Sequence, residues 1–113
     1  MSWHAYRDGS TIGTGGSEDG RILRDEEHDD GARVTLEAVS LSHRAPFAIT
    51  CGVYGAMVHT CFFGSETAAQ QTFEEIKLEL VKVLDALPER DDPDAEAKLR
   101  AVGPIFGEFV RRF

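Results

Sequence analysis

The chain has 113 residues, of which 42% are hydrophobic and 28% charged, and its formal net charge is −8. This length suits one domain with its own core, so residues 1–113 are predicted to form a single domain that needs no disulfide bond. The excess of acidic residues repels phosphate backbones and anionic lipids, which argues against nucleic acid and membranes as partners.

The sequence favours residence in the cytoplasm. Its first residues, MSWHAYRDGS, lack the basic and apolar regions of a secretory signal. The longest stretch without a charged residue, 45–65, is interrupted by glycine, serine, threonine and histidine, and its β-branched and aromatic residues favour strands over a spanning helix. Cys51 and Cys61 both lie in this stretch and are expected to be small buried apolar residues.

The first third of the chain predicts short strands and turns. A first strand is expected within residues 2–12, and the glycine-rich residues 13–20 predict a turn. A phosphate-binding loop is not expected here, because the run lacks the Lys-Ser/Thr ending and carries two acidic residues. Residues 21–25 predict a second strand, and 26–31 predict the turn that follows, with Gly31 in a left-handed conformation.

The middle of the chain contains the strongest strand signals. In residues 32–39 apolar and polar residues alternate, as in a strand with one buried face. Residues 40–45 read as a connection, and 47–53 with 56–63 predict a hairpin around Tyr54 and Gly55. Both faces of this hairpin carry apolar residues. We therefore expect its second face to be at least partly covered, either by a terminal segment, with the C-terminal phenylalanine segment as the candidate, or by a second subunit.

The last half predicts helices. The three- and four-residue spacing of apolar residues predicts a helix over 65–87, which starts near Ser65 or Thr67 and stops at Pro88. Residues 88–94 form an acidic linker, with Asp92 before a proline as a helix start. The helical segment 95–113 is expected to break or kink at Gly103-Pro104.

Two histidine-centred groups are candidates for chemistry. His28 lies in an acidic run, residues 25–30, that offers ligands for a divalent cation, although the run matches no calcium-loop pattern and a solvated turn explains the same charges. His59 lies two residues before Cys61 on one face of a strand, where an imidazole can activate a thiol. A hydrogen-bonded histidine of the core or of an interface is the simpler interpretation.

Three aromatic residues are candidates for contact with a partner. Tyr54 lies at the tip of a tight hairpin, where little core is available to it. Phe109 and Phe113 belong to the apolar C-terminal segment, which either folds back on the sheet or docks on a neighbouring subunit.

Together these patterns predict an α+β fold: an antiparallel sheet of four or five strands in meander order, one long helix packed on one face, and a broken C-terminal helix. Residues 1–64 are mainly strands. The function expected is a non-catalytic, inhibitor- or immunity-like interaction protein, without cofactor or metal, that forms a homodimer and meets a basic or polar protein partner. The alternatives are a small enzyme that uses His59 with Cys61 or the His28 cluster, and a small-molecule binder with a pocket between helix and sheet.

Overall fold

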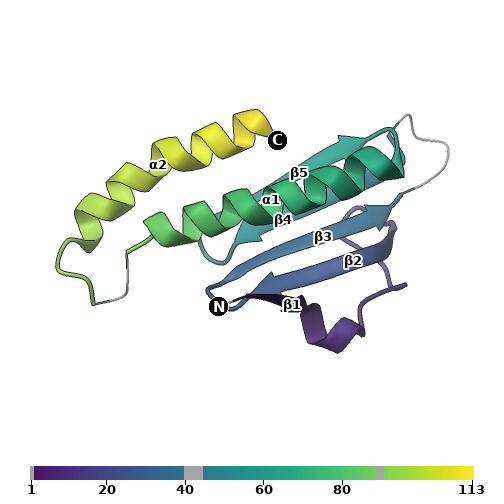
Figure 1. Ribbon diagram of the computed structural model, residues 1–113, viewed down its shortest axis with the longest axis horizontal. Coiled ribbons are helices and arrows are strands. Elements are labelled where there is room, and N and C mark those ends of the chain that lie inside the picture. Colours follow the sequence, from purple (N-terminus) through teal and green to yellow (C-terminus); the bar gives the residue numbers. More distant parts are fainter. Residues whose placement is uncertain (1, 40–44, 89–90) are drawn as a thin grey trace.

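The computed structural model describes residues 2–39, 45–88 and 91–113 and shows the predicted α+β fold. Five antiparallel strands form a meander in which each strand pairs with the next one in the chain. Helix α1 lies across one face of this sheet, and helix α2 lies beside α1 (Figure 1). The elements are β1 (Trp3–Ala5), the 3₁₀ turn η1 (Tyr6–Gly9), β2 (Arg21–His28), β3 (Ala32–Ala38), β4 (Phe47–Val53), β5 (Met57–Phe63), α1 (Glu66–Ala86) and α2 (Ala95–Arg112). Most of the predicted connection 40–45, including His43, and residues 89–90 of the linker lie outside the described residues.

Strand β2 is longer than predicted, because residues 26–28 continue the strand rather than form a turn. The turn is confined to residues 29–31, where Gly31 has a φ of +104° that favours glycine. A β-bulge between Ile22 and Arg24 shifts the register of β2 against β3. Because of this shift, Ile22 and Arg24 lie on opposite faces of the sheet, although two residues apart they would share one face in a regular strand.

The central hairpin forms as predicted. β4 and β5 pair with Thr50 opposite Thr60, and the turn between them places Gly55 at a φ of +74°. Alternation along both strands sends Ile49 and Cys61 toward α1, and they join the buried core there. The residues that alternate with these along each strand, such as Thr50 and Thr60, point to the opposite side of the sheet.

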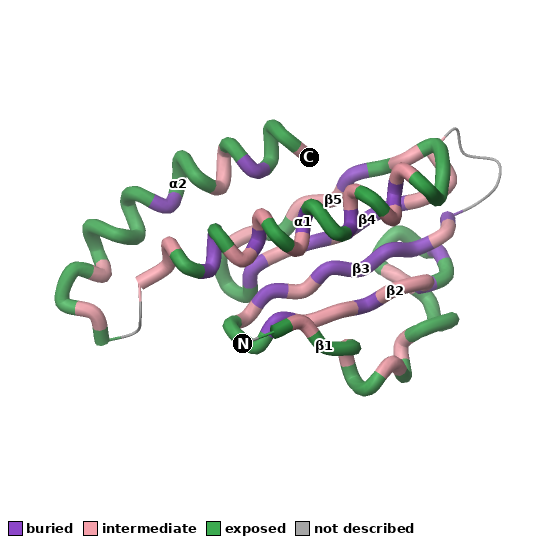
Figure 2. The backbone as a smooth tube through the Cα atoms, in the orientation of Figure 1, coloured by how far each residue is buried: buried purple, intermediate pink, exposed green. Residues whose placement is uncertain are grey.

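Helix α1 begins and ends close to the predicted bounds. Ser65 is its N-cap, with the side-chain hydroxyl accepting a hydrogen bond from the amide of Ala68 at 3.2 Å. The predicted apolar stripe is buried against the sheet. Figure 2 shows the buried segments that recur along α1. Its buried residues are Ala69, Phe73, Ile76, Leu80, Val83 and Leu84. This stripe and the inner residues of β3, β4 and β5 form the main core.

The predicted break of the C-terminal helix is wrong. Helix α2 runs without interruption through Pro104, and it begins at Ala95. Gly103 has no Cβ, which relieves the steric conflict that a proline imposes on the residue before it. The buried side chains of Val102 and Phe109, one on each side of the proline, hold the helix in place through packing.

The second face of the sheet is partly covered by a terminal segment, but this segment is the N-terminal one and not the C-terminal candidate. The C-terminal phenylalanines lie on the same side as α1, where Phe109 joins the core. The cover on the opposite side comes instead from residues 6–20, which precede β2. This N-terminal segment covers only part of that face. The rest of the face is open to solvent.

Candidate functional site

The face of the sheet opposite α1, here called the open face, is covered by residues 6–20 over β2 and β3. The Thr11 hydroxyl donates to Asp25 of β2 at 2.9 Å, and the Ser17 hydroxyl lies 3.2 Å from that of Thr50 on β4. The cover ends there among the described residues. The exposed half of the open face is therefore the part that β5 supplies, because on β4 Ala48 is buried and Thr50 and Gly52 are only partly exposed.

The exposed half is apolar and without charge. Val58 is 75% exposed and Phe62 54%, and both point away from α1. No charged residue occurs in residues 45–65, which include both strands. Exposed apolar side chains that gather on an uncharged surface are typical of interaction sites.

An ion pair lies under the covered half. The buried carboxylate of Asp25 accepts two hydrogen bonds from the Arg33 guanidinium, at 2.9 and 2.6 Å, and one from the Thr35 hydroxyl at 3.1 Å. The ring of Tyr6 lies 3.7 Å from the guanidinium carbon of Arg33. The hydrogen bonds to Asp25 raise the pKa of Arg33 above its ordinary value. This group of side chains fixes the N-terminal segment on the sheet.

The glycine-rich loop binds an anion, but the anion belongs to the chain itself. Backbone amides of Glu18 and Gly20 donate to one carboxylate oxygen of the buried Glu37, at 2.9 and 3.1 Å. The other oxygen lies beneath Gly16, where a Cβ would approach it to 2.0 Å. A side chain at this position would therefore displace the Glu37 carboxylate. The alternation in residues 32–39 predicts a solvated position for Glu37, so this contact is a difference from the sequence prediction.

A pocket of about 440 Å³ opens between the N-terminal segment and the β4–β5 hairpin. Its floor includes Gly52, where a Cβ would clash with the Met57 carbonyl at 2.5 Å. The lining combines the guanidinium of Arg33, four hydroxyls and apolar side chains. The residues are Gly15, Gly16, Ser17, Ile22, Arg33, Thr35, Thr50, Cys51, Gly52, Val53, Tyr54, Gly55, Met57 and Val58. Such a surface can accept an apolar group that carries a hydrogen-bonding end.

Tyr54 lies at the rim of this pocket and is 54% exposed, as expected for a residue at the hairpin tip. Its hydroxyl donates a short hydrogen bond to Glu27 of β2, and its amide donates to the Gly31 carbonyl at 2.9 Å. Burial and the bond to Glu27 raise the pKa of the phenol. The ring is thus held in a fixed position, which lowers the entropy cost of contact with a partner.

The acidic run around His28 does not converge on one point. Strand alternation sends Asp25 and Glu27 to the open face and Glu26 and His28 toward α1. His28 is buried, packs edge-to-face on Trp3 at 5.2 Å and accepts a hydrogen bond from the Asp30 amide at 3.1 Å. Within the described residues, no three side chains of histidine, cysteine, aspartate or glutamate gather as metal ligands would.

His59 and Cys61 share the α1 side of the sheet, as predicted. Burial raises the pKa of the Cys61 thiol to about 11 and, with Cys61 nearby, that of Cys51 to about 12. The Cys61 thiol donates to the Ile49 carbonyl, with sulfur and oxygen 3.8 Å apart. A protonated, buried thiol is a poor nucleophile, so this geometry gives no support to thiol catalysis.

The C-terminal phenylalanines pack on each other and on β5. The ring centroids of Phe109 and Phe113 are 4.9 Å apart, and that of Phe109 lies 6.4 Å from that of His59. Phe109 is buried and Phe113 half-buried. In the described chain Nε2 of His59 is buried without a hydrogen-bond partner. These residues hold α2 to the sheet, and of the two phenylalanines Phe113 is the one that remains partly accessible to a second molecule.

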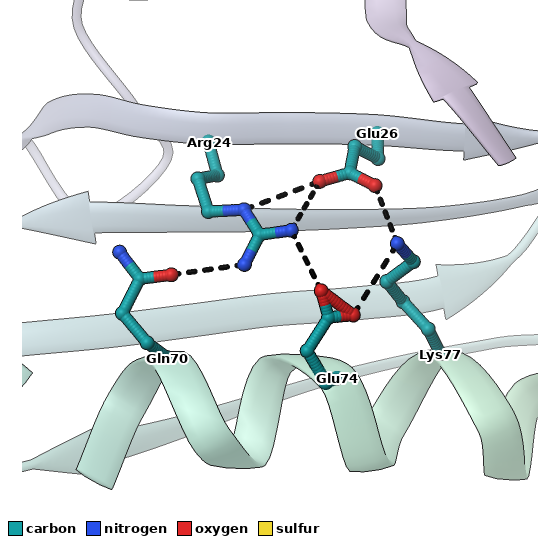
Figure 3. Close-up of polar contacts among 5 residues, drawn as sticks. All are labelled: Arg24, Glu26, Gln70, Glu74 and Lys77. Carbon is teal, nitrogen blue, oxygen red and sulfur yellow. Dashed lines mark hydrogen bonds and ion pairs between the residues drawn. The ribbon is translucent and has the colours of Figure 1, made fainter. Parts of the chain in front are cut away.

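A separate polar cluster joins β2 to α1 (Figure 3). Arg24 donates to Glu26 at 2.7 Å, to Glu74 at 3.0 Å and to Gln70 at 2.9 Å. Lys77 lies 2.6 Å from Glu26 and 3.4 Å from Glu74. Two cations and two carboxylates neutralise each other, so this cluster fastens the helix to the polar edge of the sheet.

Glu74 makes the stability of this cluster depend on pH. The hydrogen bond from Arg24, with the charge of Lys77, lowers the pKa of Glu74 from its ordinary 4.5. The ionised Glu74 carboxylate, paired with Arg24, therefore stabilises the fold above pH 4.5. This stabilisation is lost as the pH falls through the lowered pKa of Glu74. We expect Glu74→Gln to remove this part of the acid dependence, measured by urea unfolding between pH 3 and 7. Equal pH profiles for the wild type and Glu74→Gln would contradict this role of Glu74. Glu66→Gln, at the exposed start of α1, is the control.

Neither α1 nor α2, the helices of the described residues, has the length and hydropathy of a membrane-crossing segment. Comparison of the chain with models of protein families, with curated proteins and with solved structures found no match. The function must therefore be argued from the geometry of the open face.

Proposed function

We propose that this protein is a non-catalytic interaction protein of the inhibitor or immunity-like kind, which works in the cytoplasm as a homodimer and binds a basic protein partner through its open face. The observation that carries the proposal is the exposure of the uncharged side chains of Tyr54, Val58 and Phe62, of which Tyr54 and Val58 also line the pocket. A fixed aromatic ring next to a hollow is the arrangement of binding hot spots.

The charges around this surface favour a basic partner. Exposed acidic residues lie in the N-terminal segment and at the β2–β3 turn, namely Asp8, Glu18, Asp19, Asp29 and Asp30. The whole chain carries a charge of −8. Complementary charge speeds encounter and suppresses wrong partners, while the apolar centre supplies most of the affinity. The partner expected is a basic protein that inserts an apolar side chain into the pocket.

Affinity capture from the native cell tests this proposal. We expect the wild-type protein to retain a basic protein whose binding weakens as salt rises, and Tyr54→Lys to lose it by charge repulsion at the rim. Leu78→Lys is the matched control, because Leu78 is 69% exposed on α1, on the other side of the sheet. Capture that Tyr54→Lys leaves unchanged, or a partner that is acidic, would overturn the proposal.

The pocket also favours a second candidate, the binding of a small molecule. It lies on the open face rather than between helix and sheet, where Phe73, Ile49 and their neighbours fill the space. A ligand screen by thermal shift would detect such binding as a rise in melting temperature. The catalytic alternative is tested by the metal content and the thiol reactivity of the purified protein. Bound metal or a reactive Cys61 thiol would support it, and a metal-free protein with unreactive thiols would leave it without support.

A further inference from the structure

Strand β5 forms an unprotected edge of the sheet. Among the described residues, no strand pairs with its outer side. Its sequence, MVHTCFF, contains no charged residue, proline or glycine. Proteins ordinarily protect an edge of this length with lysine, proline, a bulge or a covering segment. The opposite edge is protected: β1 has only three residues, and His4 there pairs with Glu27 and Asp29.

Helix α2 extends the helix layer beyond this edge. It lies next to α1 on the β5 side of the sheet (Figure 1), held by the ion pair of Arg112 with Glu79 at 2.7 Å. Glu79 and Arg112 also line a groove between the two helices on their solvent side. On the other side of α2, past the buried line of Val102 and Phe109, an apolar stripe remains accessible.

This stripe consists of Leu99, Phe106 and Val110, which share one side of the helix at intervals of seven and four residues. Leu99 is 58% exposed and Val110 43%, while Phe106 is half-buried. Because α2 lies in the helix layer beside the last strand, a strand added to β5 would lie next to this stripe. The helix layer thus extends past β5, and its apolar stripe has no strand of the same chain beneath it among the described residues.

We propose that the missing strand is β5 of a second copy, paired antiparallel about a two-fold axis at Thr60. This inference rests on the homodimer in the proposed function and specifies its interface. The pairing sets Val58 of one copy opposite Phe62 of the other on the open face, and His59 opposite Cys61 on the helix side. Every residue then meets an uncharged residue, in a chain whose charge of −8 makes two copies repel elsewhere.

The pairing also serves the proposed partner site. A two-fold axis perpendicular to the sheet keeps both open faces on the same side. The uncharged surfaces of the two copies become continuous across the junction, and a partner meets two pockets on one sheet. A heterologous contact, which joins different edges of the two sheets, would not bring the two uncharged surfaces together.

Cysteine cross-linking tests the register directly. Facing residues of antiparallel strands have Cβ atoms about 4.5–5.5 Å apart, within reach of a disulfide after small adjustment. We expect the double variant Val58→Cys/Phe62→Cys to form a covalent dimer on mild oxidation, and neither single variant to do so, because each new cysteine then faces a valine or a phenylalanine. Thr60→Cys, on the axis, is expected to cross-link alone. The native cysteines are buried and serve as the background in the unmodified chain.

Light scattering after size exclusion gives the second readout. The wild type is expected as a dimer, and Thr60→Lys, which opposes two like charges on the axis, is expected to raise the dimer dissociation constant at least about tenfold. Circular dichroism and thermal unfolding confirm that this variant is folded. A monomeric wild type would overturn both the homodimer and this interface. A dimer in which the double variant cross-links no better than the single variants would overturn the β5 interface alone, and a dimer that captures no basic protein would overturn the partner alone.

Discussion

Replacing Asp25 with alanine is expected to lower the free energy of unfolding by about 3–5 kcal/mol, the range for removing one partner of a buried ion pair. The carboxylate is fully buried and receives bonds from Arg33, Thr35 and Thr11. Alanine leaves the guanidinium without its counter-charge and two hydroxyls without an acceptor. Because the Arg33 side chain is 33% exposed and can regain some water, the loss should fall toward the lower end of the range.

Urea unfolding at pH 7 measures this change, with the midpoint and the slope read separately. Asp25→Asn keeps the shape and loses the charge, so we expect an intermediate loss. Asp85→Ala, an exposed aspartate on α1, is the control and should remain within about 0.5 kcal/mol of the wild type. A stability of Asp25→Ala within that same margin would show that Arg33 does not depend on Asp25. Arg33 also lines the pocket. If Asp25→Ala lowers the free energy of unfolding as expected, it should therefore also weaken capture of the partner.

The central hairpin and α1 could be predicted because their local patterns agree with their final environment. Tyr54-Gly55 marks the turn, the strands beside it are uncharged, and the buried stripe of α1 follows helical spacing. Each signal depends only on residues close in sequence. The meander order follows, since consecutive strands joined by short turns pair with each other.

In strand β2, charged residues predict a turn where the structure has a strand. Glu26, Glu27 and His28 predict a solvated turn, yet they continue a strand because each finds a partner on another element. Lys77 comes from α1, Tyr54 from the β4–β5 turn and Trp3 from β1. The bulge beside Leu23 then decides which face each side chain takes. Such contacts join residues far apart in the chain and leave no local pattern.

The candidate site was only partly visible for the same reason. The exposure of Tyr54 could be expected from its place in the turn, and the second apolar face of the hairpin is what Val58 and Phe62 expose. The pocket, however, depends on the N-terminal segment crossing the sheet. Its sequence signal is the glycine-rich run that contains Gly16, since glycine permits the close approach of another element, here the Glu37 carboxylate.

The main core can be tested at Phe73, the largest of the fully buried side chains. Phe73→Ala is expected to lower the free energy of unfolding by about 3–5 kcal/mol, from lost burial and the cavity that remains. The ring also lies 4.0 Å from the guanidinium carbon of Arg24, so the substitution loosens the polar cluster that fastens α1 to β2. A small domain has only about 5–15 kcal/mol in total, so the variant should be close to unfolding at 37 °C.

Leu78→Ala is the matched control for this substitution. Leu78 lies on the same helix but is 69% exposed, and alanine is at least as good a helix former, so its stability should change by less than about 0.5 kcal/mol. A similar loss at both positions would mean that α1 does not pack on the sheet through the stripe that contains Phe73. A large loss at Phe73 alone would show that α1 is held to the sheet by its buried stripe and not by its exposed side.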